Sequence, residues 1–219
     1  MHARLKHPYV SVPVPGGSSY GGSQMWSKNR TVRKCGCGPV AAFDLLLYLQ
    51  ANGTESISLP QSREEYCRGL ETLQRRYFPL LYPLGISGIL LVLGLNRVFR
   101  DRALPYHAVW GMTRKMLNRG IYEMLENDIP VILAVGSNFP FFWEKHCMTM
   151  YREMPDALPP APCKVRSHFV TVTEADNELF QLASWGKKYS VRISDFEAYV
   201  RAYSNTVISN IVYVTKKKN

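Results

Sequence analysis

Residues 34–43, with the sequence KCGCGPVAAF, join a glycine-rich turn to the start of an apolar run. Pro39 is tolerated in the first turn of a helix, residues 40–49 are almost all apolar, and Asn52-Gly53 is a C-terminal stop signal. This pattern predicts a buried helix of about three to four turns. The other elements of the chain have to pack around this helix.

The composition is that of an ordinary folded domain. The chain has 219 residues, of which 46% are apolar. Lysine and arginine outnumber aspartate and glutamate by 27 to 17, which gives a formal net charge of +10, so anionic partners have to be considered. The basic residues are scattered, however, and only Lys216, Lys217 and Lys218 form a run. We therefore expect a solvated basic surface and not a nucleic-acid site.

The order of the patterns predicts an α+β fold, with helices in the first half and an antiparallel sheet in the second. The expected helices lie at 62–77, 86–100, 112–127 and about 194–203, and the expected strands at 129–135, 168–173, 178–185, 188–193 and 207–214. We predict a single domain over residues 1–219. It has an N-terminal extension (1–23), a mainly helical half (24–128) and a mainly β half (129–219).

Three segments bear on location and shape. Residues 77–95 carry no charge for nineteen positions, but their prolines and glycines argue against a membrane span. Residues 137–163 are rich in proline and predict a long surface excursion. The N-terminus lacks the apolar stretch of a secretory signal, so we expect a cytoplasmic protein. The five cysteines are an odd number without a CxxC pair, and we expect neither a disulfide framework nor a metal site.

Cys37 is the first candidate for chemistry, because it stands where the buried helix begins. Unpaired backbone N–H groups and the positive end of the helix dipole stabilise a thiolate there, which would lower the pKa of the thiol. Gly36 and Gly38 allow a tight turn and leave the sulfur accessible. An ordinary buried cysteine is the alternative for Cys37, and Cys35 is an alternative nucleophile or a transient disulfide partner.

A nucleophilic thiol needs a base, and His168 is the candidate among the five histidines. It opens a predicted strand in the opposite half of the chain, which is a rigid origin for an imidazole. His146 is the competitor, but it lies in the proline-rich excursion.

These residues resemble the papain-like cysteine peptidase superfamily. The resemblance rests on Cys37-Gly38-Pro39 at a helix start, the strand at 129–135, a strand opened by His168, and Ser184-Trp185-Gly186 after the next strand. It is nearest to the bacterial branch of double-glycine (bacteriocin-processing, C39-like) peptidases and covers roughly residues 24–200. It implies a papain-like fold and a cysteine protease, or thiol hydrolase, without a cofactor. Cys37 would attack a carbonyl, and His168 would act as general base and then as acid.

The chain departs from the family pattern at two positions. The third catalytic residue of the family, Asn or Asp, falls near Ala183 or Ser184, so the Ser184 hydroxyl would have to orient His168. The oxyanion-hole glutamine falls near Thr31, and Gln24 or Asn29 would have to replace it. The resemblance further implies that Trp185, Gly186 and Gly38 wall the cleft.

The sequence favours one function and leaves two alternatives open. The leading expectation is hydrolysis of a peptide or similar amide through an acyl-enzyme. The alternatives are a catalytically silent papain-like domain that binds peptides, and a module that binds an anion or nucleic acid. Peptide or protein substrates are the expected partners, whereas the oligomeric state is not encoded in any pattern that we recognise.

Overall fold

The structure, a computed structural model, describes residues 1–53, 58–139, 141, 144–154 and 159–217. The helices are η1 (Gln24–Trp26), α1 (Arg30–Cys35), α2 (Cys37–Ala51), α3 (Arg63–Tyr77), α4 (Gly88–Asp101), α5 (Arg114–Glu126) and α6 (Ile193–Tyr203). The strands are β1 (Ala3–Arg4), β2 (Pro13–Val14), β3 (Gly17–Ser18), β4 (Tyr106–Trp110), β5 (Val131–Val135), β6 (Met148–Arg152), β7 (Ala161–Val165), β8 (His168–Ala175), β9 (Leu179–Ser184), β10 (Lys187–Arg192) and β11 (Ile211–Lys216).

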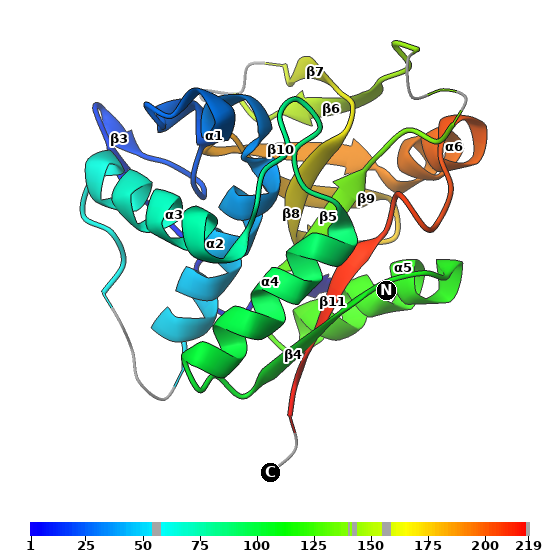
Figure 1. Cartoon of the computed structure of the whole chain (residues 1–219). Coiled ribbons are helices and arrows are strands. Elements are labelled where there is room, and N and C mark those ends of the chain that lie inside the picture. The colour runs from blue at the N-terminus through cyan, green and yellow to red at the C-terminus, as the bar shows by residue number, and fades with distance from the viewer. Residues whose placement is uncertain (54–57, 140, 142–143, 155–158, 218–219) are drawn as a thin grey trace.

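The fold is α+β, as the sequence predicts. A nine-stranded sheet has the order β4-β11-β5-β8-β9-β10-β6-β7, and β1 pairs with β8. Its strand pairs are antiparallel. Figure 1 shows α1, α2 and α3 gathered on one side of the molecule, with the sheet running through the middle. Strand β8 lies near the centre of the sheet, so a side chain at its end has a rigid support.

Helix α2 is the buried helix that residues 34–49 predict. Residues 38–49 are all buried, on every side of the helix, as expected for a helix that is apolar all round. The helix packs against β8 and β5 and against α3 and α4. Its first residue is Cys37, which therefore has a fixed position relative to β8.

The other long helices also agree with their predicted ranges, because each begins at a side chain that caps its first turn. Ser62 caps α3, Ser87 caps α4 and Thr113 caps α5, in each case by accepting a hydrogen bond from a backbone N–H. No helix in the described part of the chain is long and apolar enough to cross a membrane.

The predicted surface excursion at 137–163 is wrong in part. Strands β6 and β7 lie within or next to this range and pair with each other, and they extend the sheet beyond β10. Prolines are tolerated here because β7 is the last strand of the sheet, where an N–H group is not needed on the outer side. Residues 140, 142–143 and 155–158 of this segment lie outside the described residues.

The structure differs from the sequence-based expectations at two more places, both at the other edge of the sheet. Strand β4 is not predicted, and it pairs with β11 along its whole length. The last strand begins at Ile211 and not at residue 207, because the Asn205 side chain accepts hydrogen bonds from the N–H groups of Val207 and Ile208 and holds a turn there.

Residues 1–23 are tied to the core. Strand β1 pairs with β8, and Val10 and Val12 are completely or almost completely buried. Gly21 donates a backbone hydrogen bond to Val10, and Gly22 is so close to Tyr66 that a Cβ atom at that position would lie 1.9 Å from the tyrosine oxygen. This close packing leads the chain directly to η1 and to Gln24.

Candidate active site

Cys37 lies at the junction of two helices. Helix α1 ends at Cys35, and Gly36 is both the C-cap of α1 and the N-cap of α2. Gly38 allows the start of α2 to approach the groove wall, since a Cβ atom there would lie 2.6 Å from Ile86 and 3.3 Å from the Phe169 ring. The half-buried Cys37 is thus held between the groove wall and β8.

His168 is held on two sides. It is the first residue of β8 and pairs with Val135 of β5. Its Nε2 lies 2.8 Å from the Ser184 hydroxyl at the end of β9. The Trp185 ring stacks on the imidazole, with ring centroids 4.3 Å apart and an angle of 18° between the planes. These contacts fix the plane of the imidazole. Because Nε2 lies against Ser184, the ring nitrogen that this contact does not engage is Nδ1.

Trp185 and Gly186 form the two-residue turn between β9 and β10. Their φ angles are +49° and +72°, as in the type I′ turns that connect antiparallel strands. Gly186 adopts this conformation freely, whereas tryptophan does so at a cost of about 1 kcal/mol or more. The turn places the Trp185 ring over His168, while Gly186 faces Trp26 and does not line the groove.

Cys37 and His168 share a cavity. A surface groove of about 510 Å³ runs over both residues. Cys37, His168 and Gln24 also line a small cavity of about 10 Å³, together with Ser184. Cys35 lines only the groove, and its thiol donates a hydrogen bond to the Pro83 carbonyl at 3.4 Å. Of the two neighbouring cysteines, Cys37 is therefore the one that lines both spaces together with His168.

His146, the competing histidine, does not line either space. Its ring stacks on Tyr203 with centroids 3.9 Å apart, and its Nε2 lies against the Glu144 carboxylate. These partners belong to the surface near α6.

Burial dominates the electrostatics of the site. It raises the pKa of the Cys37 thiol, although the backbone N–H groups of Phe169 and Gly38 act in the opposite direction. It lowers the pKa of His168 to about 4. The lowered thiol pKa expected from the helix terminus is therefore not found, because the loss of water around the sulfur outweighs the nearby N–H groups. Both the Cys37 thiol and the His168 imidazole are therefore uncharged near neutral pH.

The structure separates the two oxyanion candidates. Gln24 lies in η1, lines both the groove and the cavity, and donates one amide hydrogen to the Arg33 carbonyl at 3.1 Å. A glutamine amide has a second donor hydrogen. Asn29 does not reach the site. It is exposed and caps α1 by accepting hydrogen bonds from the N–H groups of Thr31 and Val32, the usual role of asparagine before a helix.

Asp44 is a residue of this site that the sequence analysis missed. It lies two turns after Cys37 on α2, lines the small cavity and is 3% exposed. Its carboxylate accepts hydrogen bonds from Tyr66 Oη at 2.7 Å and from the Gly22 N–H at 2.9 Å. Burial raises its pKa to about 6, against these hydrogen bonds. Asp44 thereby anchors the segment that carries Gln24. The feature of the sequence that points to Asp44 is a single charged residue inside an otherwise apolar helix.

We expect Ser184→Ala to slow the alkylation of Cys37 by iodoacetamide by about 2- to 10-fold, since a neutral hydrogen bond contributes about 0.5–1.5 kcal/mol. Loss of the hydroxyl frees the imidazole to turn. Peptide mass spectrometry after timed labelling, at pH values from about 6 to about 9 that span the ordinary pKa of a thiol, measures the alkylation rate of each cysteine. Ser184→Thr keeps a hydroxyl and should keep the wild-type rate. Equal Cys37 rates in Ser184→Ala and the wild type would contradict the orienting role.

Asp44→Asn should remove a pH dependence of stability. Because the folded pKa of about 6 exceeds the ordinary 3.8, the folded state binds the Asp44 proton more tightly than the unfolded chain. The wild-type free energy of unfolding therefore falls relative to Asp44→Asn as the pH rises from about 4 to about 6, by on the order of 2–3 kcal/mol. Denaturation in urea across this range measures the difference. His168 titrates in both proteins, so its effect cancels, and a pH-independent difference would refute the assignment.

Comparisons with known proteins do not assign the site. A scan against protein-family models gave no match, and a search of curated proteins gave no match either. Within the described residues, no group of three or more His, Cys, Asp or Glu side chains is arranged to hold a metal ion. The chemistry of Cys37 and His168 therefore has to be inferred from the arrangement of the side chains themselves.

Proposed function

We propose that this chain is a cysteine-dependent hydrolase of papain-like design, acting on peptide or similar amide bonds. The observation that carries the proposal is the shared cavity: Cys37 at the start of a buried helix and His168 at the start of a central strand line it together, and the Ser184 hydroxyl lies 2.8 Å from Nε2 of the imidazole. This is the combination of nucleophile, base and orienting group that thiol catalysis needs.

The reaction begins from the neutral pair. With Nε2–H donating to Ser184, the unprotonated Nδ1 takes the Cys37 proton as the sulfur attacks the substrate carbonyl. The protonated imidazole then gives this proton to the leaving amine as the C–N bond breaks, which leaves a thioester on Cys37. Water, deprotonated by the same nitrogen, attacks the thioester, and the proton returns to the sulfur as the acid product leaves.

The negative charge of the tetrahedral intermediate needs donors. The backbone N–H of Cys37 belongs to the unpaired N–H groups at the start of α2, and the second amide hydrogen of Gln24 is the side-chain donor on the other side. Donors fixed in advance around the developing oxyanion supply a large share of the catalysis in acyl transfer.

Ser184 stands where the papain-like family has Asn or Asp, and we expect this serine to lower the rate of hydrolysis. A hydroxyl can accept a hydrogen bond from Nε2–H, but it can also donate one to an unprotonated Nε2. Ser184 therefore permits both imidazole tautomers, whereas a carboxylate permits only the one that leaves Nδ1 free. A slow hydrolase fits this site better than a fast one.

A pool of internally quenched fluorescent peptides tests the proposal. We expect the wild type to cleave members of the pool, Cys37→Ala to lose all cleavage, and Cys35→Ala, the matched control two residues away, to keep it. Mass spectrometry of the products identifies the bonds cut.

Cleavage that survives in Cys37→Ala would overturn the assignment of the nucleophile. A wild type that binds peptides of the pool without cutting any of them would instead favour the silent peptide-binding domain. The serine at the third position and the raised pKa of Cys37 are the observations that favour this second function.

A further inference from the structure

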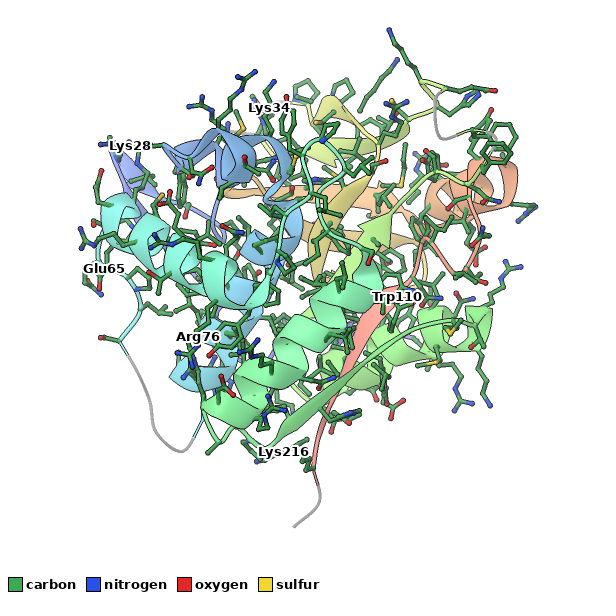
Figure 2. All side chains as sticks on the ribbon, viewed as in Figure 1. Lys28, Lys34, Glu65, Arg76, Trp110 and Lys216 are labelled. Carbon is green, nitrogen blue, oxygen red and sulfur yellow. The ribbon has the colours of Figure 1, made fainter. Side chains whose placement is uncertain are left out.

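The groove over Cys37 and His168 is lined by charges of one sign. Lys34 of α1, Lys164 of β7 and Arg166, just before β8, all line it, and its lining contains neither aspartate nor glutamate. Figure 2 shows Lys34 extending from α1 at the top of the molecule in that view. Lys34 comes from the helical side and the other two from the sheet side, so cations border the groove from both halves of the fold.

These three cations are available to a ligand. Each side chain is exposed, and in the described part of the chain none of them forms an ion pair with a carboxylate. Arg166 donates a hydrogen bond to the backbone carbonyl of Glu144, whose carboxylate lies against His146. Basic residues elsewhere, such as Arg76 and Lys188, are paired with acidic neighbours.

The remaining wall of the groove is apolar. Pro83, Leu84 and Ile86 line it, and Leu84 is 65% exposed. An exposed leucine next to a nucleophile offers a contact for an apolar side chain of the ligand. Cations on two borders and an apolar wall between them suit a ligand that carries both kinds of group.

We propose that the groove binds an acidic peptide segment, and that the enzyme prefers substrates with aspartate or glutamate close to the bond that is cleaved. This inference rests on the proposed function, because it places the scissile carbonyl at Cys37. The substrate carboxylates would lie near Lys34, Lys164 and Arg166, with an apolar side chain against Leu84. Clefts lined by one sign of charge concentrate ligands of the opposite sign.

Nucleic acid is the other polyanion that a basic groove attracts. The peptide is favoured because Cys37 and His168 line the groove, and an acyl group is the electrophile that a thiol attacks. The apolar wall from Pro83 to Ile86 also provides no partner for a sugar-phosphate backbone.

Three peptidyl chloromethyl ketones of equal length test the preference, with aspartate, serine or lysine at the two positions that precede the reactive group. Intact mass spectrometry follows the labelling of Cys37. At low ionic strength we expect the aspartate probe to react about tenfold faster than the serine probe, and the lysine probe to be slowest. This order should largely collapse at about 0.5 M salt, where exposed charges are screened.

Charge reversal supplies the matched variants. The triple variant Lys34→Glu, Lys164→Glu, Arg166→Glu should prefer the lysine probe. The control Arg75→Glu, Lys115→Glu, Arg119→Glu changes the net charge equally at exposed residues outside the groove, and should keep the wild-type order. Thermal unfolding checks that both variants are folded.

The outcomes separate this inference from the proposed function. Equal labelling of Cys37 by the three probes would overturn the acidic preference and leave the hydrolase standing. Failure of every probe to label Cys37, while iodoacetamide labels it, would overturn both. Protection of Cys37 by a single-stranded oligonucleotide at lower concentration than by a glutamate-rich peptide would overturn the preference in favour of nucleic acid.

Discussion

The close packing of α2 against the central strands is the constraint on which the rest of the structure depends. Because this helix is apolar on all sides, it has to be buried completely, and its first turn then lies against the start of β8. Gly38 permits the approach of Ile86 and Phe169. The site is thus a product of core packing: Cys37 and His168 are each the first residue of an element that the core holds rigidly.

The same burial sets the chemistry of the site. It keeps the thiol and the imidazole neutral near neutral pH, and it raises the pKa of Asp44 to about 6. An ion pair formed in advance would require water or a stronger partner than Ser184 near His168. In the reaction that we propose, the proton would move only when a carbonyl is in place, which would protect a free thiol from side reactions. In the further inference, the cationic groove that the pair lines would select which carbonyl arrives.

Long periodic segments made most of the fold predictable. The apolar run after Cys37 and the helical patterns at 62–77 and 112–127 depend on local signals, and they agree with α2, α3 and α5. Strand β7 was missed because Pro162 hides an edge strand, and β6, which contains no proline, was missed because it lies in the same proline-rich segment. Gln24 and Asn29 looked equivalent in the sequence, and only the folded N-terminal segment brings one of them to Cys37. The direction of the thiol pKa shift was also out of reach, since it depends on how much water the tertiary structure removes.

Capture of the acyl-enzyme tests the central claim, that Cys37 is the nucleophile, most directly. The protein would be mixed with an activated peptide ester, quenched in acid within seconds, and mapped by peptide mass spectrometry in the wild type and in His168→Ala. The account predicts an acyl group on Cys37 that forms quickly in the wild type, slowly in the variant, and is lost on treatment with hydroxylamine. An acyl group on Cys35 or on a lysine, with Cys37 unmodified, would contradict it.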